Sequence, residues 1–357
     1  MSYDQIADLS LSVDAVSTER KERETSSGFT RATTVISLSG AGEVGRGEDV
    51  TYTFEAHDPG NWDRLDLSLP GEYTVDSFST AVADTALFPT APDRAVFRNY
   101  RQWALESAAL GLALAQAETT LGAAVDRSVS PVRFVVSTRL GGEDTVPTAD
   151  RVTTLLDRQP GTEFKLDPTP DWPEELIEEL AATGAVRTLD FKGHYEGTDV
   201  DTPVEPAFYR RLLDAFPEAV IEDPRLTETT RTLFEGEEER VAWDAPIHGI
   251  DDIEALPFEP NWLNVKPSRF GSIERLLATI DYCKRRGIRM YGGGQFELGV
   301  GRRQNQLLAA LWYPESPNDL APTAYNDPTP SSGLAASPLS LSVPDRGFTP
   351  SGHSSAR

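Results

Sequence analysis

The chain has 357 residues, of which 39% are hydrophobic and 25% charged, and its net charge is −24 at pH 7. The length predicts about two domains, and the apolar content is sufficient for a sizeable core. No apolar stretch approaches the roughly 18 residues of a membrane span, and an acidic surface disfavours nucleic acid and anionic membranes as partners. The single cysteine excludes an internal disulfide and a thiolate metal cluster. The N-terminal residues lack the pattern of a secretory signal, so we expect a cytoplasmic protein.

Lysine is scarce in this sequence, since only five of the 33 basic residues are lysine. An acidic, lysine-poor surface suits a cytosol of high salt, where charges are screened over short distances. We therefore expect a halophilic archaeal source, with an ordinary acidic protein as the alternative. Because surface lysine is nearly absent, we expect the remaining lysines to have specific functions.

Residues 1–125 have the pattern of an α+β domain. Alternating or β-branched stretches predict strands at 9–13, 32–38 and 44–54, with a polar loop at 17–28. An Ala- and Leu-rich stretch at 104–118 predicts a buried helix, preceded by a helical segment that begins at residue 93. We expect the 17–28 loop and a second loop at 57–69 to close over the mouth of the domain that follows.

From residue 126 to 327 the predicted strands and helices alternate. The strands lie at 132–137, 163–166, 186–190, 219–222, 241–244, 262–266 and 288–291, with a weak eighth near 320–325. The helices lie at 148–158, 172–183, 205–216, 227–235, 250–256, 271–286 and 300–312. This alternation predicts an α/β fold, either a barrel or a doubly wound sheet. Residues 328–357 are rich in Pro and Ser and lack periodicity, so we expect a disordered tail without a catalytic role.

Charged residues end five successive predicted strands: Lys165, Asp190, Glu222, Asp244 and Lys266. A doubly wound sheet gathers its site at one switch point, whereas all strands of a closed barrel end at one mouth, so this series favours a barrel. Three carboxylates can hold one side of an octahedral Mg²⁺, and burying three negative charges without a cation is costly. The alternative is that each carboxylate caps a helix or pairs with an arginine. The sequence therefore predicts an Mg²⁺ site.

Lysines beside such a site would have a chemical role. Burial lowers the pKa of a lysine toward neutrality, where the amine can act as a base. A carboxylate substrate bound to Mg²⁺ has a more acidic α-proton, because the metal stabilises the enolate. We therefore expect Lys165 and Lys266 to assist the removal of an α-proton from a small carboxylate substrate, rather than to be solvated surface side chains.

These features resemble the enolase superfamily, in the branches of the muconate-lactonizing enzymes, the o-succinylbenzoate synthases and the mandelate racemases. The resemblance rests on the Gly-x-Gly-Glu turn at 45–48, the helix at 103–114, Lys165, Asp190, the Glu-Asp-Pro segment at 222–224, Asp244, Lys266 and the segment 295–299. It implies a modified (β/α)₇β TIM-like barrel, residues 126–327, beneath an α+β capping domain, residues 1–125. It also implies that Asp190, Glu222 and Asp244 ligate the metal.

Two positions depart from the family pattern. The second strand usually reads Lys-x-Lys but here reads Lys165-Leu-Asp167, and the third usually reads Asp-x-Asn but here reads Asp190-Phe-Lys192. One hypothesis is that Lys192 supplies the amine missing at position 167, opposite Lys266, while Lys165 holds the substrate carboxylate. The other hypothesis is that Lys192 and Asp167 form a salt bridge that neutralises both.

The resemblance implies an Mg²⁺-dependent lyase or isomerase, namely a dehydratase, a cycloisomerase or an epimerase. Asp167 and Glu297 are expected to contact the substrate, with Lys266 as an alternative partner of Glu297. Two other functions stay open: a metal-dependent barrel hydrolase that activates water, and a non-catalytic ligand-binding barrel. The sequence does not identify the substrate or the step that follows proton removal. It does not decide the oligomeric state, and a homo-oligomer is compatible with it.

Overall fold

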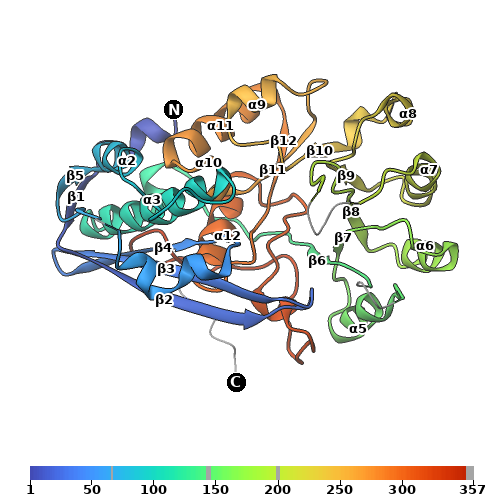
Figure 1. Ribbon diagram of the computed structural model, residues 1–357, viewed down its shortest axis with the longest axis horizontal. Coiled ribbons are helices and arrows are strands. Elements are labelled where there is room, and N and C mark those ends of the chain that lie inside the picture. Colours follow the sequence, from blue (N-terminus) through green and yellow to red (C-terminus); the bar gives the residue numbers. More distant parts are fainter. Residues whose placement is uncertain (66, 142–145, 198–201, 351–357) are drawn as a thin grey trace.

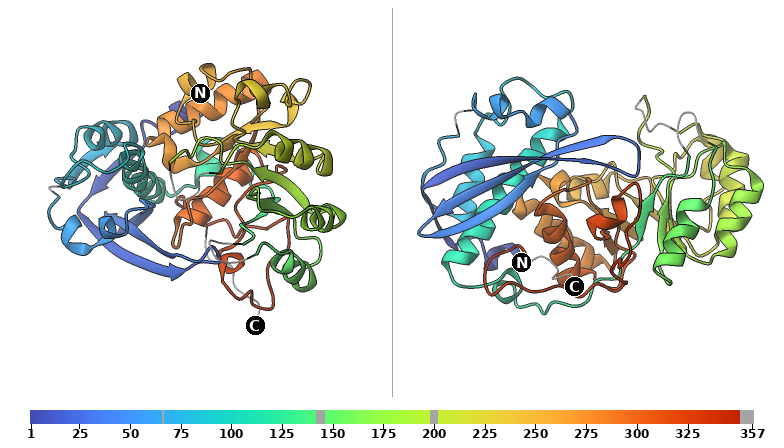
Figure 2. Two further views of the ribbon diagram at one scale, coloured as in Figure 1. Left: turned by 45° about the vertical axis from the view of Figure 1, so that its right-hand side comes forward. Right: turned by 90° about the horizontal axis from the view of Figure 1, so that it is seen from below.

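The computed structural model describes residues 1–65, 67–141, 146–197 and 202–350. The N-terminal third forms a cap of strands and helices that lies beside a barrel built from the rest of the chain (Figures 1 and 2). None of the helices in the described ranges has the length and apolar character that a bilayer crossing requires.

The cap is built on a three-stranded antiparallel sheet with a long helix against it (Figure 1). The sheet has the order β2 (Ala15–Glu24), β3 (Thr30–Gly40) and β4 (Glu43–Asp49), and the helix is α3 (Val96–Gln116). A Cβ atom on Gly45 would lie 2.0 Å from the Ala108 carbonyl oxygen, and one on Gly47 would lie 1.9 Å from that of Ala104. The Gly-x-Gly-Glu segment at 45–48 therefore lies within β4, inside the strand predicted at 44–54, and its glycines allow the strand to contact the helix.

The other elements of the cap are short. They are β1 (Ser10–Val13), paired with β5 (Gly71–Thr74), and the helices α1 (Pro59–Trp62), α2 (Val75–Ala83) and α4 (Leu121–Ala124). The predicted loop at 17–28 is wrong, because most of it is strand β2, which pairs with β3 along its whole length. β2 is an edge strand rich in exposed charged side chains, a composition that is easily interpreted as a loop. The two predicted helical segments after residue 93 are the single helix α3.

The barrel wall is a seven-stranded parallel sheet whose strands keep their sequence order (Figure 1). The strands are β6 (Val136–Thr138), β7 (Phe164–Leu166), β8 (Val186–Asp190), β9 (Val220–Glu222), β10 (Val241–Trp243), β11 (Trp262–Val265) and β12 (Arg289–Gly292). The helices are α5 (Asp150–Arg158), α6 (Glu174–Ala182), α7 (Pro206–Ala215), α8 (Glu228–Arg231), α9 (Ile250–Glu254), α10 (Pro267–Phe270), α11 (Ile273–Arg286) and α12 (Gly301–Trp312). The predicted fold, a modified (β/α)₇β TIM-like barrel with an α+β cap, is confirmed.

Residues 318 and 319 occupy the position of the eighth strand. Isolated parallel bridges join Asn318 to Phe134 and Asp319 to Gly293, so this segment lies between β12 and the chain that leads into β6. The strand predicted at 320–325 is therefore misplaced, and Thr323–Asn326 forms a 3₁₀-helix. The Asn318 side chain makes hydrogen bonds to the backbone on both sides in place of a longer ladder, so the segment needs no strand-like periodicity.

The segment that follows the barrel packs against it. Leu334, Leu339 and Phe348 are buried, and Leu339 exchanges backbone hydrogen bonds of 2.9 and 2.7 Å with Val132. The prediction of a disordered tail is therefore wrong for residues 328–350, and its remainder, 351–357, lies outside the described residues. Isolated apolar side chains fix this segment, and such contacts leave no periodic signal in a Pro- and Ser-rich sequence.

Two buried glutamates of the cap bind the N-terminal ends of two barrel helices. Glu48, on β4, accepts hydrogen bonds from the backbone N–H groups of Leu298 (2.7 Å) and Gly301 (2.8 Å), where α12 begins. Glu106, on α3, accepts one from the N–H of Ile273 (2.9 Å), the first residue of α11. The first N–H groups of a helix lack intrahelical partners and favour negative charge. These contacts fix the cap on the barrel beside the ends of β11 and β12.

Candidate active site

Three buried carboxylates lie at the ends of three neighbouring strands. Asp190 and Glu222 are the last residues of β8 and β9 and are paired in register, and Asp244 directly follows β10. All three side chains are fully buried. Asp223 accepts hydrogen bonds from the backbone N–H groups of Asp244 (2.9 Å) and Ala245 (2.8 Å), which fixes the end of β10. The structure thus brings together the three carboxylates that the strand ends predicted.

Lys165, on β7, lies between these carboxylates. It is 2% exposed, and its Nζ is 2.6 Å from Glu222 Oε1 and 3.1 Å from Asp190 Oδ2. The same Nζ is 3.6 Å from Asp319 Oδ2, at the eighth-strand position. The sequence analysis missed Asp319, because no strand pattern surrounds it. Lys165 therefore neutralises carboxylates that come from three different strand positions.

Lys192 faces the aspartate of the second-strand segment. Its Nζ lies 3.4 Å from Asp167 Oδ2 and also donates a hydrogen bond to Asp190 Oδ2. Its backbone φ is +54°, a left-handed conformation that is uncommon for a residue with a Cβ atom, and its N–H lies 3.2 Å from Asp190 Oδ1. The salt bridge considered from the sequence is therefore present, and the same ammonium group reaches a predicted metal ligand.

Lys266 approaches Asp244 from the strand next to β10. It follows β11, and its Nζ donates a hydrogen bond to Asp244 Oδ2 (2.8 Å). A Cβ atom on Gly293 would lie 2.3 Å from Asn264 Oδ1 and 2.8 Å from Lys266 Cε, so a larger residue here would displace the side chains of the site. Arg269, on α10, donates to the Asp244 carbonyl oxygen (2.6 Å) and to the Tyr195 hydroxyl (2.9 Å). The sequence analysis missed Arg269, although its position nearly one helical turn after Lys266 could have indicated it.

Glu222 has two further partners that the sequence analysis did not assign. The Tyr291 hydroxyl, on β12, donates to Glu222 Oε2, and Asn264 Nδ2, on β11, lies 3.3 Å from both carboxyl oxygens. Asn264 precedes Lys266 by two residues and therefore lies on the same face of β11. Strand parity could have found this asparagine, because alternate residues of a barrel strand point inward.

Glu297 lies near the site but is bound by residues of its own segment and of α12. Its Oε1 accepts hydrogen bonds from the N–H of Gln295 (2.7 Å) and from Asn305 Nδ2 (3.0 Å), and its Oε2 lies 3.2 Å from Arg302 Nε. A contact of Glu297 with the substrate stays a prediction, whereas the alternative contact with Lys266 is not present among the described residues. The reason is that the buried guanidinium group of Arg302 lies beside the Glu297 carboxylate and competes with Lys266 as its cationic partner.

The pKa values of the lysines differ from the sequence-based expectation. Burial lowers the pKa of Lys165, Lys192 and Lys266, but the adjacent carboxylates outweigh burial and raise all three above the ordinary value. The expected lowering toward neutrality is therefore wrong for this arrangement, in which each lysine is a counterion. Burial, followed by the negative charge of Asp190, raises the pKa of Glu222 to about 8. Near neutral pH this favours the protonated, uncharged form of Glu222, so the site carries less negative charge than its number of carboxyl groups suggests.

The three carboxylates are candidate ligands of a metal ion. In the described part of the chain, no three Asp, Glu, His or Cys side chains are arranged to hold one ion. The ammonium groups of Lys165 and Lys192 pair with the carboxylates instead. The donor set nevertheless fits a hard cation, because it consists of carboxylate oxygens and because Asp244 Oδ1 is buried with no hydrogen-bond partner among the described residues. Asp190, Glu222 and Asp244 are therefore the residues that could hold a divalent cation.

Comparison with known families gives matches over most of the chain. Residues 4–124 match "Domain of unknown function (DUF8230) N-terminal domain", and residues 128–327 match "Domain of unknown function (DUF8230) C-terminal domain". A curated relative, the o-succinylbenzoate synthase of Bacillus subtilis (strain 168), is 37% identical over 59 residues. That alignment spans 16% of this chain and 16% of the relative, so it concerns only a small part of either protein.

Solved structures resemble most of the chain. An unknown member of the enolase superfamily from Enterococcus faecalis V583 is 19% identical, with a TM-score of 0.61 over 88% of each chain. The dipeptide epimerase from Methylococcus capsulatus, complexed with Mg and the dipeptide L-Arg-D-Lys, is 18% identical, with a TM-score of 0.67 over 88% of this chain and 92% of that chain. At these identities the likeness establishes the fold. The resemblance to the enolase superfamily stated from the sequence is confirmed at that level.

Proposed function

Because the chain belongs to the family described as "Domain of unknown function (DUF8230)" and has the fold of the enolase superfamily, we propose that it is an Mg²⁺-dependent enzyme that removes the α-proton of a small carboxylate substrate. The observation that carries this proposal is that Lys165 and Lys266 lie on either side of three buried carboxylates. A dehydratase, a cycloisomerase and an epimerase can all begin with this proton removal, so each is compatible with the site.

The carboxylates of Asp190, Glu222 and Asp244 would hold the cation. When bound, it would stabilise the negative charge that develops on the substrate carboxylate as the α-proton leaves. Lys165 and Lys266 are kept protonated by these same carboxylates. Each lysine can therefore accept a proton only when its carboxylate partner no longer pairs with it.

We assign a separate role to each of the three lysines. Lys266 accepts the α-proton, because it ends a strand and its Nζ lies beside the predicted ligand Asp244 (2.8 Å). Lys165, between two carboxylates, binds the substrate carboxylate. Lys192, which reaches the site beside Asp167, supplies the second amine on the face opposite Lys266. Two amines on opposite faces would allow a proton to be removed from one face and returned to the other.

A solvent-exchange screen tests the proposal. The protein is incubated in D₂O with acid sugars, dipeptides and succinylbenzoate precursors, with and without Mg²⁺, and the α-proton signal of each compound is followed by NMR. We expect Mg²⁺-dependent loss of this signal for at least one class. Exchange that persists with a chelator, or metal-dependent hydrolysis without exchange, would contradict the proposal, and the second result would identify a barrel hydrolase.

A non-catalytic binding barrel is the second candidate function. It is favoured by the pairing of all three lysines with carboxylates, which raises their pKa values and disfavours proton acceptance. Such a protein would bind a carboxylate ligand without altering it. A library compound that binds in calorimetry but shows no α-proton exchange with Mg²⁺ present would support this candidate over the enzyme.

A further inference from the structure

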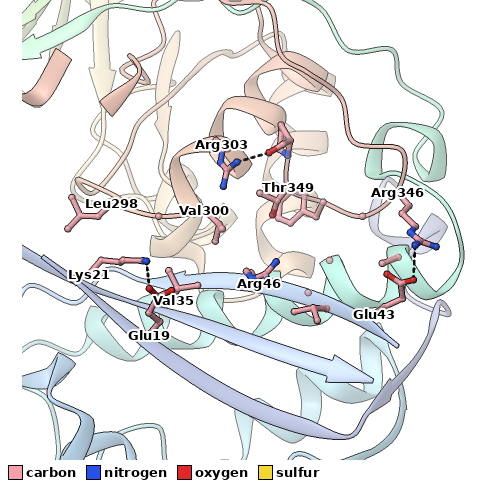
Figure 3. Close-up of a pocket in the computed structure, with 18 residues that line it drawn as sticks. Glu19, Lys21, Val35, Glu43, Arg46, Leu298, Val300, Arg303, Arg346 and Thr349 are labelled. Atoms are coloured by element: carbon pink, nitrogen blue, oxygen red, sulfur yellow. Dashed lines mark hydrogen bonds and ion pairs between the residues drawn. The ribbon is translucent and has the colours of Figure 1, made fainter. Parts of the chain in front are cut away.

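A cavity of about 760 Å³ lies between the cap sheet and the C-terminal segment (Figure 3). Its walls come from the strands β2, β3 and β4, from α3, from the start of α12, and from residues 346–350. Asp190, Glu222 and Asp244 do not line it, so it is separate from the candidate active site. Its volume is within the range of roughly 300–1,000 Å³ that is usual for small-molecule sites.

Positive charge gathers in this cavity, although the whole chain has a net charge of −24. Its charged lining consists of four cations and two carboxylates: Lys21, Arg46, Arg303, Arg346, Glu19 and Glu43. The carboxylates are already used, because Glu19 pairs with Lys21 and Glu43 lies 3.0 Å from Arg346. Two arginines therefore remain without a carboxylate partner among the residues that the structure describes.

These two arginines, Arg46 and Arg303, lie on opposite sides of the cavity (Figure 3). Arg303 donates to the neutral carbonyl oxygen of Pro350 (3.1 Å), which leaves its charge uncompensated. Next to it on α12, Gln304 Nε2 donates to the backbone oxygen of Arg46 (2.7 Å) and to Thr349 Oγ1 (3.1 Å). This side chain joins β4, α12 and the C-terminal segment, so it holds together the backbone segments that carry the two arginines.

We propose that the cavity binds a small anion that carries phosphate or carboxylate groups, through Arg46 and Arg303. Guanidinium groups recognise carboxylate and phosphate oxygens with paired hydrogen bonds, so either group would serve as the anionic part of the ligand. Val35, Val300 and Phe348 form an apolar part of the lining, against which the rest of the molecule would pack. This site is independent of the proposed proton abstraction and would exist in a non-catalytic barrel as well.

Isothermal titration calorimetry with AMP, pyrophosphate and citrate, at one fixed ionic strength, tests the proposal and separates phosphate from carboxylate ligands. We expect at least one of these probes to bind, and Arg46→Ala and Arg303→Ala each to weaken binding by about tenfold or more, as for loss of a charged hydrogen bond. Arg286→Ala is the matched control, because Arg286 is an exposed arginine on α11 that pairs with Glu259 and should not affect binding. Failure of all three probes to bind, or equal affinity in the Arg46→Ala variant and the control, would overturn the proposal.

Chemical labelling gives a second measurement that does not depend on substitutions. Phenylglyoxal modifies accessible arginines, and mass spectrometry reports the rate at each position. A saturating probe that binds in this cavity should slow the modification of Arg46 and leave that of Arg286 unchanged. Equal rates at Arg46 with and without the bound probe would place the ligand elsewhere and contradict the proposal.

Discussion

Lys192 Nζ lies 3.4 Å from Asp167 Oδ2, so the two residues that depart from the enolase-superfamily pattern face each other. The family pattern has a lysine at position 167 and an asparagine at position 192, whereas this chain has an aspartate and a lysine. This chain therefore keeps one ammonium group, but the group comes from the neighbouring strand, and a carboxylate stands at position 167. It also binds Asp190, which links the exchanged pair directly to the predicted metal ligands.

Substitutions at these two positions separate the two explanations of the pair. If Lys192 takes part in the reaction, as we propose, Lys192→Ala should reduce kcat by about 10²-fold or more, the usual contribution of an acid–base group. Adding Asp167→Asn should then not restore activity. The measurement is kcat of both variants on a substrate found by the exchange screen. Recovery of activity in the double variant would show instead that Lys192 only neutralises Asp167.

Mg²⁺ should stabilise the folded protein, because the three carboxylates that would bind it come together only on folding. The thermal unfolding midpoint of the wild type, followed by circular dichroism, should rise with Mg²⁺ concentration. Asp244→Asn should remove most of this rise, whereas Asp214→Asn, an exposed position on α7, should keep it. An equal rise in the wild type and in Asp244→Asn would assign Mg²⁺ binding to the acidic surface.

The contact between Glu48 and the start of α12 should contribute to stability. Glu48→Ala leaves the buried N–H groups of Leu298 and Gly301 without their acceptor, so we expect the free energy of unfolding to fall by about 2 kcal/mol. Denaturant unfolding measures this change, and amide hydrogen exchange at Gly301 should become faster. Glu55→Ala, an exposed cap position, is the control. Unchanged exchange at Gly301 would mean that Glu48 does not hold this helix end.

Stability should depend on pH through Glu106. Burial raises the pKa of this carboxyl above its ordinary value of 4.5, although hydrogen bonds from Gln102, Ile273 and Ser79 oppose the shift. The folded state therefore favours the protonated form, and the contribution of Glu106 to stability is present below pH 4.5 and is lost as the pH rises through the raised pKa. The unfolding midpoint of the wild type should accordingly fall relative to that of Glu106→Gln as the pH rises above about 4.5. A difference that stays constant with pH would contradict the raised pKa.

The barrel and its carboxylates could be predicted because their signals are local in the sequence. Parallel strands end at one mouth, so Asp190, Glu222 and Asp244 converge even when strand boundaries are uncertain by a residue or two. The pKa values of the lysines could not be predicted in the same way. Burial, which lowers these pKa values, can be inferred from the sequence. The carboxylates raise them by more than burial lowers them, and the distances to the carboxylates come only from the fold.

The missed features depend on contacts between segments distant in the sequence. Asp319 lies in a two-residue strand position without periodicity, and its role follows from Lys165, which belongs to another part of the chain. Strand β2 is defined by pairing with β3 rather than by its own composition. Residues 328–350 are fixed by a few apolar side chains whose partners, such as Val132, lie far away along the chain.

We propose that Lys266 removes an α-proton in a reaction that requires Mg²⁺. The most direct measurement is the rate of α-proton exchange with D₂O, followed by NMR, for the wild type and Lys266→Ala with saturating Mg²⁺. If Lys266 is the base, a chelator should abolish exchange by the wild type, and Lys266→Ala should slow it by about 10²-fold or more. Equal exchange rates for the two proteins would contradict this role.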